Sequence, residues 1–290
     1  MKQTVLVPLD GSKLAERALK VAGSIATARE GAGVALLRAL ETPRLNAWLP
    51  AEMLPLHEHE KKVATQYLAS QASLLEKQGI EVRTILAPGP GPVEAVVDEC
   101  KAGRADLIVM SSHGDTGWLE LFLGSNAEKI ARLAPAKILV VKGEGDSPPP
   151  FKKILIPLDG SQRAETALPL ALDVAPGGSA SIILAGISVV FQGHAFEGDM
   201  RATVEPDLKR IQEYLDGQAE WLSSQGYQVD TVIKRGEPAE EILKLTEETE
   251  TDLVLMTSHG RTGFAVWLYG SVAERILRHA PCSVLVMKES

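Results

Sequence analysis

The feature that most constrains this chain is an internal repeat, because a repeated sequence implies a repeated fold. Three segments of the first half recur in the second half, 146 to 149 residues later. The matching segments are VLVPLDGS (5–12) and ILIPLDGS (154–161), DLIVMSSHG (106–114) and DLVLMTSHG (252–260), and APAKILVVK (134–142) and APCSVLVMK (280–288). The stretch between the copies reads GEGDSPPP, and its Gly and Pro residues favour neither a strand nor a helix. We therefore predict one domain at 1–142, a linker at 143–150 and a second domain at 151–290.

Each copy alternates short, β-rich apolar runs with longer helical patterns. The expected strands are residues 5–8, 34–40, 82–86, 107–110 and 138–141 in the first copy, and 154–157, 181–187, 229–233, 253–256 and 284–287 in the second. The expected helices follow the first strands (about 15–22 and 164–171), occupy 58–78 and 207–225, begin at Pro92 and Pro238, and precede the last strands. Alternating β and α elements predict an α/β fold. We expect two Rossmann-like domains, each a five-stranded parallel sheet with helices on both faces.

Composition excludes several functional classes. The formal net charge is -8, which argues against sequence-independent nucleic-acid binding, since that requires clustered basic residues. Every apolar run is shorter than the roughly 20 residues that cross a bilayer, and Pro8 and Asp10 interrupt any signal-peptide core. Cys100 and Cys282 are isolated, so we expect two buried thiols and neither a disulfide framework nor a metal site. These features predict a soluble cytoplasmic protein with no membrane or nucleic-acid partner.

Each first strand is followed by an Asp-Gly-Ser turn, at 10–12 and again at 159–161. The turn has two interpretations. It can be purely structural, with glycine allowing the tight bend and serine capping the next helix. Alternatively, because ligands of open parallel sheets bind beyond the carboxyl ends of the strands, the aspartate could accept a hydrogen bond from a ribose or base hydroxyl.

A second group of residues follows the fourth strand of each copy. A glycine-containing loop leads to a Gly-Ser pair, at 124–125 and at 270–271, and both serines begin an S-x-x-E pattern. This pattern is typical of a capping box, in which the serine is the N-cap of a helix. A helix N-terminus preceded by glycine offers backbone N–H groups to an anion, so these parts could hold a phosphate chain. An ordinary capped helix is the alternative.

With these residues in view, the chain resembles the universal stress protein family, in the tandem form with two such domains. The resemblance covers both copies nearly end to end. The ATP-binding signature of that family is Gly-x2-Gly-x9-Gly-Ser/Thr. Gly114 is followed, after nine residues, by the Gly-Ser pair at 124–125, and Gly260 precedes the pair at 270–271 with the same spacing. Two of the three signature glycines are therefore present in each copy.

The first signature glycine is replaced in both copies, by Ser111 and by Thr257. A side chain at this place could obstruct the approach of a phosphate, or impose a backbone conformation that glycine would relieve. Its hydroxyl could instead donate a hydrogen bond to a phosphate oxygen. The sequence leaves both readings open.

The resemblance implies a set of nucleotide-binding residues. They are Pro8, Asp10, Ala39, Ser111, Gly114, Gly124 and Ser125 in the first copy, and Pro157, Asp159, Gly186, Thr257, Gly260, Gly270 and Ser271 in the second. The first three of each set would hold adenine and ribose, and the others would surround the phosphates. The resemblance also implies that the fifth strands pair along an antiparallel edge, which would make the chain an intramolecular pseudo-dimer or join two chains in a homodimer.

Several other features are weaker signals. His113 and His259 recur in the glycine loops, but no nucleophile or orienting acid accompanies them, so we expect a role in the loop or beside a phosphate. The pair His57 and His59 occurs in one copy only and indicates a solvated surface. Long irregular segments at 41–57 and 188–206 differ between the copies and are candidates for lids or partner-binding loops.

The leading hypothesis is therefore a stress-response protein that binds ATP, or else ADP or AMP, with or without Mg, in one or both domains. Occupancy would regulate its interaction with a protein partner. ATP hydrolysis, if any, would be slow, because no Walker lysine or Mg-binding acidic cluster is evident. The alternatives are a nucleotide-free scaffold and an enzyme of the adenine-nucleotide hydrolase or ligase type. The latter would need a loop resembling SGGxDS after the first strand, and PLDGS lacks its paired glycines.

Overall fold

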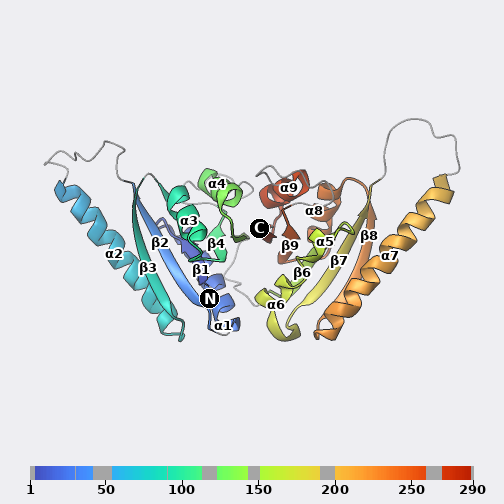
Figure 1. The fold of residues 1–290 in the computed structure, drawn as a ribbon, viewed down its shortest axis with the longest axis horizontal. Helices are drawn as coiled ribbons and strands as arrows, with labels where there is room; N and C mark the ends of the chain where they lie inside the picture. Colours follow the sequence, from blue (N-terminus) through green and yellow to red (C-terminus); the bar gives the residue numbers. More distant parts are fainter. Residues whose placement is uncertain are drawn as a thin grey trace. The chain divides into compact units, whose positions relative to one another are not determined.

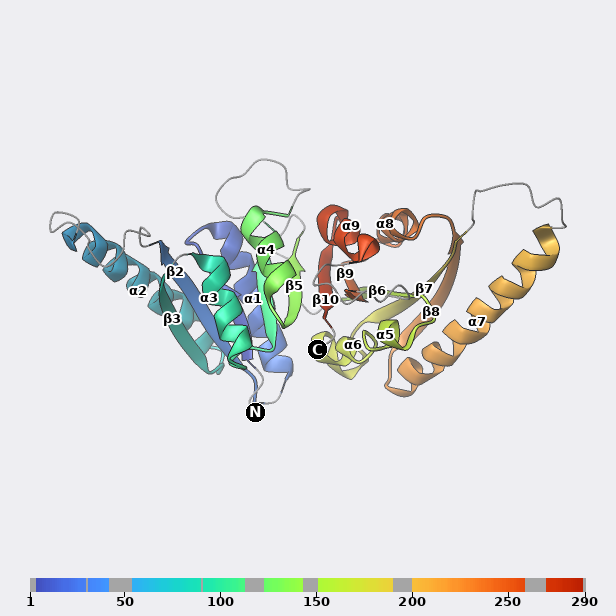
Figure 2. The same ribbon diagram turned by 45° about the horizontal axis from the view of Figure 1, so that its top comes forward.

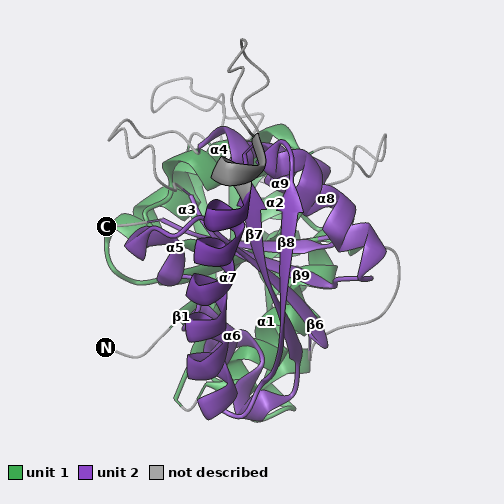
Figure 3. Ribbon diagram, turned by 90° about the vertical axis from the view of Figure 1, so that its right-hand side faces the viewer, with its two compact units in different colours: residues 1–141, 146–148 green, residues 142–145, 149–290 purple. Residues whose placement is uncertain are grey.

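A computed structural model describes residues 4–29, 31–41, 54–89, 91–112, 123–142, 151–189, 200–258 and 270–288. The chain divides into two compact units, coloured separately in Figure 3. Unit 1 comprises residues 1–141 and 146–148, and unit 2 comprises residues 142–145 and 149–290. The predicted linker, 143–150, lies outside the described residues. Each unit is described by itself below.

Unit 1 contains five strands and four helices in its described part (Figure 1). In chain order they are β1 (Thr4–Pro8), α1 (Lys13–Ala28), β2 (Gly33–Glu41), α2 (Leu54–Glu76), β3 (Val82–Gly89), α3 (Pro92–Lys101), β4 (Leu107–Ser111), α4 (Ser125–Leu133) and β5 (Lys137–Val141). The sheet order is β3-β2-β1-β4-β5, and the ladders are parallel. The strand order therefore reverses beside β1.

Unit 2 repeats this order with one change in the first crossover. Its elements are β6 (Lys153–Leu158), α5 (Gln162–Glu165), α6 (Leu170–Val174), the 3-10 turn η2 (Pro176–Gly178), β7 (Ser181–Ser188), α7 (Met200–Ser224), β8 (Gln228–Arg235), α8 (Pro238–Glu248), β9 (Leu253–Thr257), α9 (Ser271–His279) and β10 (Ser283–Met287). The sheet order is β10-β9-β6-β7-β8, and its ladders are also parallel. The predicted α/β class and the two five-stranded Rossmann-like domains are confirmed.

Helices cover both faces of each sheet, which explains why the strands read as continuous apolar runs. In unit 1, α1 and α2 pack on one face, and α3 and α4 pack side by side on the other (Figure 2). The core is aliphatic, as the scarcity of aromatic residues predicts. Its centre consists of fully buried strand residues such as Leu6, Leu36 and Ile108 in unit 1 and Leu155 and Ile156 in unit 2. The sheet therefore forms a rigid platform, and its strand ends are where side chains can serve a ligand.

The first crossover of unit 2 differs from the prediction of one helix over 164–171. Unit 1 has a continuous helix of 16 residues, α1, whereas unit 2 has two short helices separated by a turn that contains Pro169. Proline has no backbone N–H and its ring clashes with the preceding helical turn, so it interrupts the i to i-4 bonds. The segment uses i to i-3 bonds instead, for example from the Leu168 N–H to the Glu165 carbonyl. The helical periodicity was correct, but the proline decided the local geometry.

The capping-box prediction is wrong by one residue in both units. The N-caps of α4 and α9 are Gly124 and Gly270, and neither helix has a side-chain cap. Ser125 and Ser271 are the first helical residues, so their hydroxyls do not cap the helix. By contrast, Ser12 and Ser161 act as predicted: each side chain accepts a backbone N–H three residues ahead, at 3.0 and 3.1 Å.

Candidate functional site

The candidate site is a pocket in unit 2, at the place where the strand order reverses. Its volume is about 640 Å³, and it opens beyond the carboxyl ends of β6, β7 and β9. In an open parallel sheet the crevice between two neighbouring strands whose crossovers go to opposite faces is the usual binding site. Here these strands are β6 and β9, which are adjacent in the sheet. The volume lies within the roughly 300–1,000 Å³ of small-molecule pockets.

Asp159 lines this pocket and comes directly after β6. Its carboxylate accepts the Ser161 backbone N–H at 3.0 Å and the Ser161 hydroxyl at 2.6 Å. Gly160, between them, has φ +80, a left-handed conformation that glycine adopts without steric cost. The turn thus orients the carboxylate, and its structural and ligand-binding interpretations are compatible. The corresponding turn of unit 1 has the same form, with Gly11 at φ +96 and the Asp10 carboxylate 2.9 Å from the Ser12 nitrogen.

The N-terminus of α9 forms the polar end of the pocket. Gly270, Ser271, Val272 and Ala273 all line it. The first intrahelical bond joins the Glu274 N–H to the Gly270 carbonyl, so the three preceding N–H groups have no partner within the helix. Because no side chain caps them, these groups and the helix dipole are directed at whatever occupies this end. The arrangement suits an anion.

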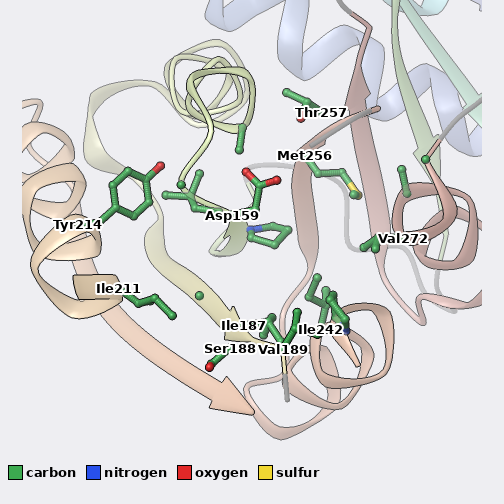
Figure 4. A pocket seen from close by; sticks show the side chains of 18 of the residues that line it. Asp159, Ile187, Ser188, Val189, Ile211, Tyr214, Ile242, Met256, Thr257 and Val272 are labelled. Atoms are coloured by element: carbon green, nitrogen blue, oxygen red, sulfur yellow. The ribbon is translucent and has the colours of Figure 1, made fainter. Parts of the chain in front are cut away.

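The side walls of the pocket are mainly apolar. Figure 4 shows Ile211 and Tyr214 of α7 on one side, Met256, Thr257 and Val272 on the other, and Asp159 between them. Ile242 of α8 approaches from the second face of the sheet. Apolar walls with a few polar groups at fixed places are typical of sites for flat organic ligands.

A charged cluster lies at the rim of the pocket. The Asp207 carboxylate accepts hydrogen bonds from Arg210 at 2.7 Å and from the Ser188 hydroxyl at 3.1 Å, and all three residues line the pocket. The pairing holds the start of α7 to the end of β7. It also compensates the Asp207 charge within the protein.

Thr257, at the position of the first signature glycine, is the last residue of β9 and lines the pocket. It has ordinary strand conformation, and so does Ser111 at the end of β4. Neither residue occupies a left-handed conformation, so no backbone strain arises from replacing glycine here. Of the readings that the sequence left open, an imposed backbone conformation is therefore not supported. A hydroxyl facing the ligand is compatible with the pocket.

The structure brings six of the seven predicted residues of the second copy to one pocket: Pro157, Asp159, Gly186, Thr257, Gly270 and Ser271. In unit 1, Pro8, Asp10, Ser111, Gly124 and Ser125 occupy the equivalent strand-end and helix-start positions. Gly114, Gly260, His113 and His259 lie outside the described residues, as do most of the two irregular segments, 42–53 and 190–199.

Ala39 does not occupy the position equivalent to Gly186. Pro8 pairs with Leu37 in unit 1, and Pro157 pairs with Ala185 in unit 2. The next residue on each second strand is therefore Arg38 in unit 1 and Gly186 in unit 2. Ala39 was given the same role as Gly186, but it lies one residue beyond the equivalent position. In a strand, a shift of one residue changes the face of the sheet. Sequence reasoning overlooked Arg38, although a basic residue in an otherwise apolar strand was a visible signal.

Two equivalent tyrosines stand beside the two sites, Tyr67 on α2 and Tyr214 on α7. Burial raises the pKa of each phenol, and the nearby carboxylates of Glu16 and Glu165 raise it further. Both hydroxyls are buried and have no hydrogen-bond partner of good geometry in the part of the chain described. A buried, protonated hydroxyl is a donor that a polar ligand group could satisfy.

The described residues were also compared with the requirements of a membrane span and of a metal site. No helix among them is long and apolar enough to cross a membrane. No group of three or more His, Cys, Asp or Glu side chains within the same ranges is arranged to hold a metal ion. Cys100 and Cys282 are both buried, and they form no disulfide.

Comparison with known proteins agrees with the fold and the repeat. The sequence model of the universal stress protein family matches residues 1–142 and 150–288. A universal stress protein of Methanocaldococcus jannaschii is 34% identical over 141 residues, which are 48% of this chain and 83% of that protein. The crystal structure of a universal stress protein from Archaeoglobus fulgidus covers 99% of this chain and 98% of its own, with a TM-score of 0.72 and 22% identity.

A functionally unknown protein of Pseudomonas aeruginosa also superposes, over 99% of this chain and 92% of its own, with a TM-score of 0.69 and 20% identity. At this level of identity the two structural likenesses show the fold alone. The family match is more specific, because it finds the domain twice and spans nearly the whole chain. The chain therefore belongs to the universal stress protein family and carries two copies of the family's domain.

Proposed function

We propose that this stress-family protein binds an adenine nucleotide, ATP first among the candidates, in the pocket of unit 2, and that occupancy regulates its interactions. The observation that carries the proposal is the combination of chemical environments in one pocket. Apolar walls, an oriented carboxylate and an uncapped helix N-terminus line it together, and they suit the base, the sugar and the phosphates of a nucleotide.

The base would lie against the apolar side chains of Ile211, Ile242 and Met256. Gly186 supports this placement, because a Cβ there would lie 2.6 Å from Ile211 Cγ2. α7 therefore packs close to the strand, which places Ile211 at the pocket wall, and no side chain from position 186 extends into the pocket.

The sugar and phosphates would use the polar groups. Asp159 would accept a hydrogen bond from a ribose hydroxyl. The hydrogen bonds that Ser161 donates to it already hold its carboxylate in place, so no reorganisation would be needed. The phosphates would meet the unpaired N–H groups at the start of α9 and the Ser271 hydroxyl. Local dipoles would thus attract an anion to a chain of net charge -8. A Mg ion accompanying ATP would be held by the phosphates and water.

The first test is direct. The protein is purified without added nucleotide and denatured, and the supernatant is chromatographed for ATP, ADP and AMP. Binding of added nucleotide is then measured by equilibrium dialysis with radiolabelled ATP, and GTP serves as a competitor to test the preference for adenine. Nucleotide-free protein that also shows no saturable binding up to millimolar ATP would leave the scaffold alternative and refute this proposal.

The second test places the site. Gly270→Val puts a branched side chain where the phosphates would approach, and we expect ATP affinity to fall about 100-fold, or ~2.7 kcal/mol. The backbone of Gly270 has φ -57 and ψ 151, which valine adopts readily, so the fold should persist. Gly217→Val on α7 is the matched control, because nothing lies within 4 Å of its added Cβ. Equal affinity of both variants would show that this pocket is not the site.

A further inference from the structure

The two units differ at one position that borders the site. Strand register makes Arg38 of β2 the counterpart of Gly186 of β7, as the pairing of Pro8 with Leu37 and of Pro157 with Ala185 shows. Unit 1 therefore has a long, charged arginine side chain at the position where unit 2 has glycine. In unit 2 this position lines the candidate pocket.

A second exchange compensates the first. The helices α2 and α7 end in matching turns, in which the Ile80 N–H bonds the Leu75 carbonyl and the Tyr227 N–H bonds the Leu222 carbonyl. This alignment makes Ala64 the counterpart of Ile211, the residue against which a Cβ at Gly186 would collide. Unit 1 therefore combines a large strand residue with a small helix residue, and unit 2 combines the reverse. The two exchanges are thus complementary in size.

The Arg38 guanidinium lies where unit 2 has its pocket. A Cβ placed on Gly11 would lie 3.0 Å from Arg38 Nη1, so the guanidinium rests against the Asp-Gly-Ser turn. Its carbon is also 5.1 Å from the centre of the Tyr67 ring, in cation–π geometry. The counterparts of Gly11 and Tyr67 in unit 2 are Gly160 and Tyr214, and both line the pocket. The side chain therefore fills in unit 1 the space that remains open in unit 2.

We propose that Arg38 closes the nucleotide site of unit 1, so that the chain binds one nucleotide, in unit 2. This inference rests on the proposed function of the unit 2 pocket. The base would have to displace the guanidinium from Gly11 and from the Tyr67 ring. Unit 1 keeps the helix-start elements for phosphate, but Arg38 would occupy the place of the base.

The experiment counts bound nucleotides per chain by equilibrium dialysis with radiolabelled ATP, checked by native mass spectrometry. We expect one nucleotide for the wild-type chain, lost in Gly270→Val and retained in Gly124→Val. We expect two for Arg38→Gly, the second of which disappears when Gly124→Val is added. Arg38→Ser, which keeps a Cβ, is a second opening variant, and circular dichroism confirms that each variant is folded.

The outcomes separate this inference from the function beneath it. No nucleotide on the wild-type chain would refute the proposed function, and this inference with it. Two nucleotides on the wild-type chain, or one that Gly124→Val removes, would leave nucleotide binding intact and overturn the closure of unit 1. One nucleotide on both opening variants would show that Arg38 is not the obstruction. Ala39→Gly, which places glycine on the same strand and leaves Arg38 intact, should still bind one.

Discussion

The two units of this chain share a framework and differ in what occupies the space beside the first strand. Both have the same strand order, the same oriented aspartate and the same uncapped helix start. In unit 2 the pocket is lined by Gly186, where α7 packs close to the strand, whereas in unit 1 the Arg38 guanidinium lies against the equivalent turn. A duplicated fold can thus keep its backbone and its turns while exchanges at two side-chain positions alter the surroundings of the first strand's end.

A second difference lies away from the sites. In unit 1, Glu99 of α3 accepts hydrogen bonds from Arg83 and Arg104, at 3.0 Å and at 2.8 to 3.1 Å. Pro92 and Pro238 begin α3 and α8, so the counterpart of Glu99 is Leu245, which is buried. At this one position, unit 1 therefore has a carboxylate paired with two arginines and unit 2 has a buried leucine.

The largest effect is expected from the first crossover. Lys20 of α1 is the counterpart of Pro169, so Lys20→Pro transfers the helix break of unit 2 to unit 1. Because α1 is a continuous helix at this point, the variant should lose about 3 kcal/mol of unfolding free energy. Urea denaturation followed by circular dichroism measures the loss, and Lys20→Ala is the control. A loss no greater than that of Lys20→Ala would mean that unit 1 accommodates the broken crossover.

Transplanting the closure of unit 1 should have the next largest effect. Gly186→Arg combined with Ile211→Ala reproduces in unit 2 the residues of unit 1, and we expect ATP affinity to fall about 100-fold, or ~2.7 kcal/mol. Equilibrium dialysis measures it, with Ile211→Ala alone and Gly217→Arg as controls. A double variant that binds ATP as well as Ile211→Ala does would remove the size exchange as the basis of the difference.

A smaller effect is expected from the two aspartates. Asp159→Ala removes the proposed acceptor of a ribose hydroxyl and should weaken ATP binding about tenfold, or ~1.4 kcal/mol. Asp10→Ala removes the same turn hydrogen bond in unit 1, where we propose that no nucleotide binds, and should leave affinity unchanged. Isothermal titration calorimetry compares them. Equal losses in both variants would argue that the units bind alike.

The smallest effect concerns acid. The hydrogen bond from Arg104 holds the pKa of Glu99 below its usual range, although burial opposes this shift. Because the folded-state pKa is depressed, the contribution of Glu99 is complete above the ordinary glutamate pKa and is lost as pH falls through the lowered value. Arg83 and Arg104 are about half exposed, so we expect only on the order of 1 kcal/mol.

Hydrogen exchange of peptides from α3, followed from pH 7 to successively lower pH, would measure this stabilisation. Glu99→Gln should lose protection at pH 7 and differ little from the wild type in acid. Glu76→Gln, at an exposed position of α2, should show neither change. If α3 of Glu99→Gln lost as much protection in acid as α3 of the wild type, the ionic cluster would not be the cause of the acid sensitivity.

Much of the fold could be predicted from local patterns. Buried strands such as β1 and β9 read as continuous apolar runs, and Pro92 and Pro238 mark helix starts. Residues at strand ends, such as Asp159 and Thr257, were located because parallel strands bring their carboxyl ends to one edge. The errors occurred where neighbouring elements compete locally, as at Pro169, or where a serine and a glycine could each serve as the cap, as at Ser271 and Gly270.

The amino-acid sequence by itself determined the duplication, the parallel α/β architecture and the residues at the strand ends, because repeats, hydrophobic period and turn residues are local properties. Only the tertiary structure decided that Arg38, not Ala39, is the counterpart of Gly186, and that the Arg38 guanidinium reaches the turn at Gly11. Strand register and the closeness of a helix to a sheet depend on contacts between residues far apart in the chain. Strand register and the closeness of helix to sheet together decide how much space remains at the end of the first strand.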